Sequence, residues 1–183
     1  MFKAKIIVVG PCESGKTAVS NFLGDQTDHS ESNYHPTAGV RILEFEQQVK
    51  SRNRNVDVEI ELWDCSGSEE YESCWPAMAS NADSVIIMYN PFESSNKLQL
   101  NNWFDYFVSG QGLKEEYCAI FAHCKNKEAT KNISSPLSDN IPFYVTNLDG
   151  DPDQLKDAFT KILGRVLSKL SDSREKEELS IIN

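Results

Sequence analysis

An eight-residue segment near the start of the chain has the composition of a loop that binds phosphate groups. It runs from Gly10 to Thr17 and matches the pattern G-x-x-x-x-G-K-[ST]. Its glycines let backbone N–H groups turn inward around an anion, and Lys16 supplies a positive charge for the outer phosphates. The Thr17 hydroxyl is an oxygen ligand of the kind that Mg²⁺ accepts. We expect nucleotide contacts along this segment, from Glu13, Ser14, Gly15, Lys16, Thr17 and Ala18.

A second element follows further along the chain and supplies a carboxylate and a glycine. Asp64 closes a segment of alternating apolar and polar residues and begins the sequence Asp-Cys-Ser-Gly, a D-x-x-G element. A carboxylate at the end of a strand can hold Mg²⁺ through a water molecule. The N–H of Gly67 can approach a terminal phosphate because no side chain stands in the way.

The segments around these residues predict an α/β domain. A continuous apolar run at residues 3–9 favours a buried parallel strand before the phosphate loop, and residues 16–23 favour a helix after it. Strict alternation at 56–62, preceded by a strand at 40–49, predicts an antiparallel hairpin at a sheet edge. Further strands are expected at 84–89, 117–122 and 141–145, with helices at 98–108 and 151–170. This pattern predicts a six-stranded, mostly parallel sheet with one antiparallel edge hairpin and helices on both faces.

Composition excludes several functional classes. The chain has 183 residues, with 18 Lys and Arg against 28 Asp and Glu, for a net charge of −10. Nucleic-acid binding and docking on an anionic membrane both favour a basic surface, so neither is expected. The sequence contains no apolar run of membrane-spanning length, and its five cysteines, without a C-x-x-C pair, predict free thiols in the cytoplasm. The charged tail at 171–183 has no cysteine for lipidation, so no direct membrane anchor is expected.

Two further stretches make the sequence resemble the Rab-like small GTPases across residues 1–170. They are Trp-Asp-Cys-Ser-Gly-Ser-Glu at 63–69 and Tyr-His-Pro-Thr-Ala-Gly-Val at 34–40. The resemblance implies a P-loop small GTPase fold that binds GTP or GDP with Mg²⁺. It implies metal ligation by Thr17 and Thr37 directly and by Asp64 through water. It also implies an apolar partner-binding patch of Ile42, Trp63 and Met78, for which core packing is the alternative.

The resemblance is stronger to one branch of that family, which serves intraflagellar transport complex B. Its residues include Phe-Lys-Ala-Lys-Ile at 2–6, Gly-Val-Arg-Ile-Leu-Glu-Phe at 39–45 and Glu-Ser-Cys-Trp-Pro-Ala at 72–77. Membership of this branch would imply coiled-coil subunits of that complex as partners. It would also imply a location in the cytoplasm and in the cilium or flagellum and its base.

The motifs also depart from an active GTPase. Ser68 occupies the position of the Gln that orients the attacking water, and its side chain is too short for that task. No residue is therefore assigned a catalytic role. The guanine-reading N-K-x-D motif is altered, because its Asp falls on Asn126, after Lys125, in the simplest alignment. A second base-contact loop remains at Thr146, Asn147 and Leu148.

These observations lead to three hypotheses. The favoured one is a GTP-binding subunit that acts as a binding module, with slow or absent hydrolysis. The alternatives are a competent GTPase switch completed by a residue from a partner, and a structural protein that holds no nucleotide. His123 either contacts the base or is a satisfied loop histidine.

Overall fold

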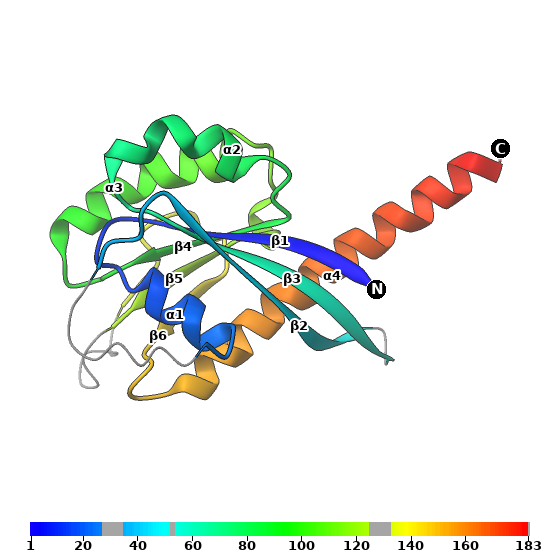
Figure 1. Cartoon of the computed structure of the whole chain (residues 1–183), viewed down its shortest axis with the longest axis horizontal. Coiled ribbons are helices and arrows are strands. Elements are labelled where there is room, and N and C mark those ends of the chain that lie inside the picture. Colours follow the sequence, from blue (N-terminus) through cyan, green and yellow to red (C-terminus); the bar gives the residue numbers. More distant parts are fainter. Residues whose placement is uncertain (27–34, 52–53, 125–132, 183) are drawn as a thin grey trace.

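One mixed sheet organises the chain. The computed structural model describes residues 1–26, 35–51, 54–124 and 133–182. Six strands lie in the order β2-β3-β1-β4-β5-β6, with only the β2–β3 pair antiparallel (Figure 1). The predicted sheet, with its edge hairpin, is therefore confirmed. The strands are β1 (Phe2–Val9), β2 (Val40–Ser51), β3 (Arg54–Cys65), β4 (Ser84–Tyr89), β5 (Ala119–His123) and β6 (Phe143–Thr146).

Helices cover both faces of this sheet, as Figure 1 shows. Helices α1 (Lys16–Leu23) and α4 (Pro152–Ile182) lie on one face. The opposite face carries α2 (Trp75–Ala79) and α3 (Ser94–Phe104). A π-helical turn, η2 (Asp105–Ser109), extends α3, and short 3₁₀ turns lie at η1 (Glu69–Cys74) and η3 (Glu115–Tyr117).

The strand sequences explain which face each side chain occupies. In β1, Ile6 and Val8 pack with α1 and α4, whereas Ile7 and Val9 pack with the other layer, so the second half of the strand is apolar on both faces. In β3, Val58, Ile60 and Leu62 belong to the first core, and the residues between them, Glu59 and Glu61, are half-exposed. The β1–β3 register pairs Val8 with Asp64, so the end of β3 lies beside the start of the phosphate loop.

Helix α4 is longer than the sequence predicted. It continues past Leu170 to Ile182 and projects from the domain (Figure 1). Residues 171–182 are rich in Glu, Lys and Arg, which favour helix, and Arg174 pairs with Glu178 one turn later at 3.5 Å. The segment that we expected as a charged tail is thus a helical extension. No described helix combines the length and the apolar character needed to cross a membrane.

The first core depends on the buried face of α4, and Phe159 is one of its largest members. Its ring is 1% exposed and lies 6.4 Å from the ring of Phe45. We expect Phe159→Ala to lower the free energy of unfolding by about 3–5 kcal/mol, because it removes a buried ring and leaves a cavity. Leu179→Ala is the matched control, since Leu179 is 61% exposed on the same helix. Denaturant unfolding of both variants tests this, and equal stabilities would contradict it.

Candidate nucleotide-binding site

The phosphate loop lies between β1 and α1 in a backbone conformation that turns N–H groups inward. Glu13 has a positive φ of 57° although it is not glycine, and Gly15 has a φ of 90°. A Cβ atom added at Gly15 would lie 2.5 Å from Cδ2 of His123, so only glycine fits here. Ser14 is buried and Ala18 is exposed in the first turn of α1. The predicted loop residues therefore form one continuous cradle.

Lys16 is held inside this loop. Its ammonium Nζ donates to the carbonyl oxygens of Gly10 at 2.9 Å and Pro11 at 2.7 Å, and to the Ser14 hydroxyl at 3.4 Å. Burial lowers the pKa of Lys16 to about 8, and the nearby charge of Asp64 opposes this shift. A buried ammonium whose charge is disfavoured by desolvation would be stabilised by an anion. This is the electrostatic condition for a phosphate site.

Three side-chain oxygens converge beside Lys16. The Thr17 hydroxyl donates to Oδ2 of Asp64 at 2.8 Å and lies 2.9 Å from the hydroxyl of Thr37. Thr37 also lies 3.4 Å from the same carboxylate oxygen. Asp64 is fully buried and its Oδ1 has no hydrogen-bond partner among the described residues. A set of hard oxygen donors around an unsatisfied buried carboxylate fits Mg²⁺. The residues predicted to hold the metal are thus brought together.

Burial raises the pKa of the Asp64 carboxyl, and hydrogen bonds from Thr17 together with the charge of Arg41 oppose that shift. Arg41 was missed in the sequence as a member of this site. Its Nε lies 3.8 Å from Oδ2 of Asp64, and its guanidinium also contacts Asn21 of α1. The hairpin register places Arg41 directly opposite Asp64. Aligning the two predicted strands of the hairpin could therefore have identified Arg41 as a neighbour of Asp64.

Gly67 is pressed against the phosphate loop. A Cβ atom at this position would lie 2.5 Å from the backbone N of Cys12 and 2.6 Å from the carbonyl oxygen of Gly10. Glycine is therefore required where the two predicted phosphate elements meet. The next residue, Ser68, caps η1, and its hydroxyl accepts from the N–H of Glu70 at 3.3 Å.

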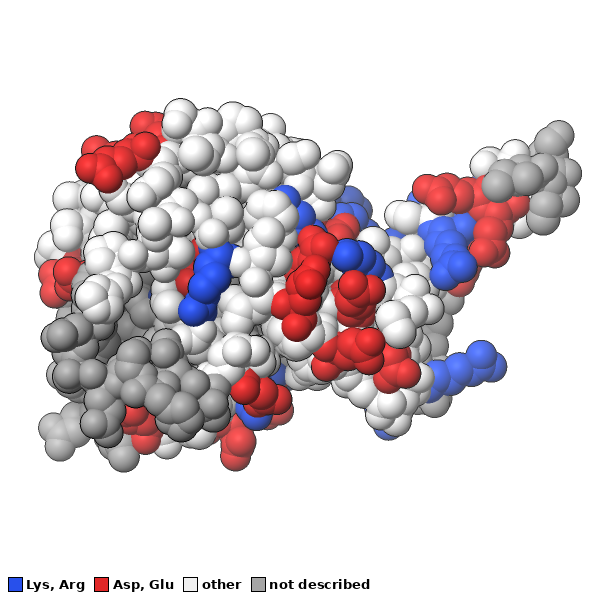
Figure 2. Space-filling view, viewed as in Figure 1, with Lys and Arg blue, Asp and Glu red and all other residues white. Residues whose placement is uncertain are grey.

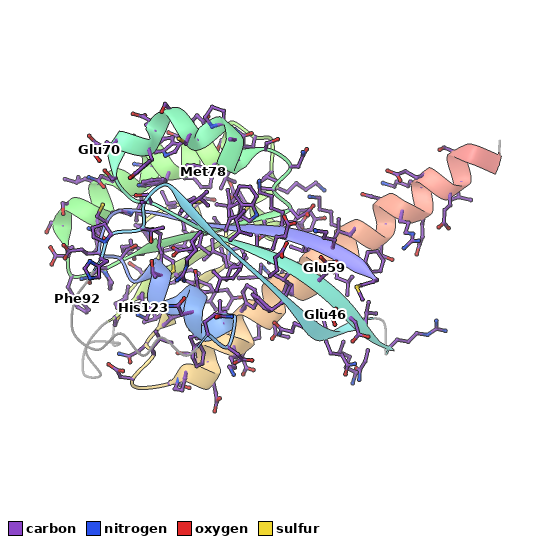
Figure 3. All side chains as sticks on the ribbon, in the orientation of Figure 1. Glu46, Glu59, Glu70, Met78, Phe92 and His123 are labelled. Carbon is purple, nitrogen blue, oxygen red and sulfur yellow. The ribbon has the colours of Figure 1, made fainter. Side chains whose placement is uncertain are left out.

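The opposite end of the site is built from β5 and β6. The ring of His123 is buried, and its Nδ1 lies 3.0 Å from the hydroxyl of Thr146. His123 thus connects the Gly15 turn to the β6 loop, a positioning role that sequence reasoning left open (Figure 3). Asn147 is buried and its Oδ1 accepts from the N–H of Gly150 at 2.6 Å, while Leu148 is half-buried. The predicted base contacts Lys125 and Asn126 lie outside the described residues.

The predicted partner patch is only partly present at the surface. Ile42 is 46% exposed and pairs directly with Trp63 across the hairpin. Trp63 is half-buried, with Nζ of Lys5 lying 3.6 Å from its ring centroid. Met78 was wrongly assigned to this patch. It is 2% exposed and belongs to the core beneath α2, as Figure 3 indicates, because that short helix turns it toward the sheet.

The buried carboxylate should limit the stability of the protein without its ligands. Because folding raises the pKa of Asp64, its ionised form disfavours the folded state, and stability falls as pH rises through its titration. We expect Asp64→Asn to raise the melting temperature of the nucleotide-free protein at pH 7 by about 2–4 °C, since a neutral amide costs less to bury.

The same variant should weaken Mg²⁺-dependent binding of a nucleoside triphosphate, because the metal loses an anionic partner. Thermal scans at pH 5 and pH 7, with and without Mg²⁺ and GTP, test both effects. Asp57→Asn, which changes an exposed carboxylate on the same strand, is the control. A destabilised Asp64→Asn apoprotein that retained wild-type Mg²⁺ dependence would contradict the assignment.

Comparison with known proteins agrees with this geometry. Residues 5–127 match the Roc family, described as Ras of Complex, Roc, domain of DAPkinase. The intraflagellar transport protein 22 homolog of Danio rerio is 40% identical over 186 residues, which cover 100% of both chains. A GTP-bound crystal structure titled T. brucei IFT22/74/81 superposes with a TM-score of 0.78 at 30% identity, covering 94% of this chain and 99% of that one. A GDP-bound T. brucei IFT22 structure gives 0.70 at 29%, covering 92% and 98%.

The sequence match extends over the whole chain, and the structural match covers 94% of it. Its identity level is far above what a shared fold alone would require. The chain therefore belongs to the intraflagellar transport protein 22 family, built on a Ras-like GTPase domain.

Proposed function

We propose that this chain is a GTP-binding subunit of intraflagellar transport complex B. In this role it acts as a binding module in cilium or flagellum assembly, with slow or absent hydrolysis. The observation that carries the proposal is the convergence of the Thr17, Thr37 and Asp64 oxygens beside the buried Lys16 ammonium. Related chains were crystallised with GTP and with GDP, which supports the same nucleotides here.

Each part of the site has a distinct task in this proposal. The phosphate loop, with Lys16, would hold the phosphates. The converging oxygens of Thr17, Thr37 and Asp64 would hold Mg²⁺, with Asp64 acting through water. Bound Mg²⁺ would neutralise part of the phosphate charge. Gly67 would offer its N–H to the terminal phosphate, because no side chain keeps the backbone away. Residues 1–170 are the nucleotide-binding unit, and residues 171–183 are its charged extension.

Ser68 explains why hydrolysis should be slow. Its hydroxyl accepts from the N–H of Glu70 and so caps η1. Its single hydroxyl also lacks the reach of a Gln amide toward an attacking water. We therefore propose that Ser68 helps to hold η1 in place and does not orient the attacking water.

Assembly with other subunits supplies the second half of the function. The related T. brucei protein was crystallised in a complex titled IFT22/74/81. We propose that this chain binds the corresponding coiled-coil subunits and reaches the cilium through them. The Ile42–Trp63 pair on the hairpin is a candidate contact, because it combines an exposed aliphatic side chain with an accessible indole.

The identity of the bound nucleotide tests the first part of the proposal, which is that the chain binds GTP. The purified protein is denatured, any released nucleotide is identified, and the refolded or exchanged protein is titrated with GTP, GDP and ATP with and without Mg²⁺. We expect Mg²⁺-dependent binding of GTP and GDP, and about 2.7 kcal/mol of added stability at 100 times the dissociation constant.

Thr17→Val is the matched variant for that titration, because it keeps the branched shape and removes only the hydroxyl. It should lose most of the Mg²⁺ dependence while the protein remains folded. A wild-type protein that binds no nucleotide and gains no stability from GTP would instead favour a structural role for the loop.

Ser68→Gln tests the proposed cause of slow turnover. The Gln amide could orient water, so we expect a faster intrinsic release of phosphate from GTP than in the wild type. Ser68→Ala is the control, since it removes the same cap hydroxyl, at a cost of about 1 kcal/mol, without adding an amide. Single-turnover phosphate release measures both. Unchanged turnover in Ser68→Gln would exclude Ser68 as the cause.

When a partner is added, the same assay separates the binding-module hypothesis from that of a GTPase switch completed by a partner residue. A switch completed by a partner residue should accelerate by about 10³-fold or more in the complex. A binding module should show no such acceleration.

A further inference from the structure

Arg41 is the ion-pair partner of the buried carboxylate at the proposed metal site. Its Nε lies 3.8 Å from Oδ2 of Asp64, and Asp64 forms no other ion pair within the part of the chain that the structure describes. The ammonium of Lys16 instead donates to three oxygens of its own loop. A residue outside the phosphate loop therefore pairs with the charge of Asp64.

This ion pair leaves both carboxylate oxygens accessible to other donors or cations. Nε of Arg41 is buried and makes no hydrogen bond to any described residue, so at 3.8 Å it acts through its charge. Oδ1 of Asp64 likewise has no hydrogen-bond partner in the described ranges of the chain. Arg41 thus offsets part of the cost of burying a carboxylate without taking the place of a hydrated metal ion.

Two neighbouring elements hold the guanidinium at this position. The β2–β3 register places Arg41 directly opposite Asp64, and Nη2 of Arg41 donates to Oδ1 of Asn21 in α1. Asn21 is itself buried. A guanidinium presents several N–H donors in a rigid, planar fork, so it can engage an amide with one edge while another edge faces a carboxylate. The position of the positive charge is therefore fixed by β2, β3 and α1 together.

We propose that Arg41 is a positioning residue that takes the part of a metal cation at Asp64 whenever the protein holds no Mg²⁺. Its fixed charge stabilises the buried carboxylate, so the protein stays folded between the release of one nucleotide and the binding of the next. Bound Mg²⁺ would neutralise the same carboxylate, and the ion pair with Arg41 would then contribute less to stability. By linkage, the presence of the guanidinium makes Mg²⁺ binding weaker than it would be without it.

This inference rests on the proposed function, because it assigns Mg²⁺ and a nucleotide to the site. It goes further by identifying a residue that is not a metal ligand and that controls how firmly the metal is held. A merely structural role for Arg41, as an anchor for Asn21, predicts the same loss of stability with and without Mg²⁺.

The first test is a double-mutant cycle on the nucleotide-free protein in EDTA. Arg41→Met keeps a long unbranched side chain and removes the charge, and Asp64→Asn removes the charge of its partner. We expect Arg41→Met to lower the melting temperature by about 4 °C or more, and by about half of that or less in the Asp64→Asn background, where no anion remains to be balanced. Lys50→Met, which removes an exposed positive charge from the same strand, is the control and should match the wild type.

The cycle also decides the case in which Arg41→Met does not fold in EDTA. Folding that is restored in the Asp64→Asn background supports the inference, because the unbalanced carboxylate is then the cause of the failure. Equal losses of stability in the two backgrounds, or a failure to fold in both, would overturn it.

The second test measures Mg²⁺ affinity at saturating GTP, by titrating Mg²⁺ and following the fluorescence of a methylanthraniloyl-labelled GTP. We expect Arg41→Met to bind Mg²⁺ about 5-fold or more tightly than the wild type. Arg41→Lys, which keeps the charge without the planar fork, should stay closer to the wild type than Arg41→Met does. Unchanged or weaker Mg²⁺ binding by Arg41→Met would contradict the inference.

These outcomes distinguish this inference from the proposed function. If the wild type binds neither GTP nor Mg²⁺, the proposed function fails and the inference fails with it. If the wild type binds both, but the cycle is additive or Arg41→Met holds Mg²⁺ no more tightly, only the inference fails and the proposed function stands.

Discussion

The buried carboxylate of Asp64 is the constraint on which the rest of the site depends. It lies at full burial between the phosphate loop and the hairpin. One of its oxygens accepts from Thr17, and the other has no hydrogen-bond partner in the part of the chain that the structure describes. A charge in that position is costly unless cations and donors surround it. The parallel pairing of β1 with β3 and the antiparallel pairing of β2 with β3 supply them, by placing Lys16 on one side and Arg41 on the other. The sheet order is thus what makes a nucleotide site possible here.

In that arrangement, nucleotide binding and nucleotide hydrolysis depend on different residues. Binding needs charge, oxygen ligands and backbone N–H groups, and these come from the rigid ends of β1 and β3. Hydrolysis also needs a positioned water, and Ser68, at which we propose that this role is lost, caps the start of η1. A protein can therefore retain the first property after losing the second, because different elements supply them.

Much of the fold followed from local patterns. The apolar run of β1 and the alternation in β3 predicted a buried strand and an edge hairpin, because burial on one or two faces leaves a direct mark on sequence. The phosphate-loop residues followed from spacing. Met78 was misjudged because the rotation of the short helix α2 is set by the packing of its Trp75 into the core. The link from Gly15 through His123 to Thr146 joins three distant segments, so no local pattern contains it. The end of α4 was placed too early because its extension has no apolar periodicity.

The extension of α4 also gives the domain a projecting helix that continues one of its core helices. Beyond Leu170 the helix adds about 18 Å of length at 1.5 Å per residue, and its exposed surface carries charges of both signs (Figure 2). The same helix packs into the first core through Phe159 and Leu163. The direction of the extension is therefore fixed relative to the sheet as long as the helix stays continuous. A molecule that binds the helical extension would therefore set the direction in which the nucleotide pocket faces.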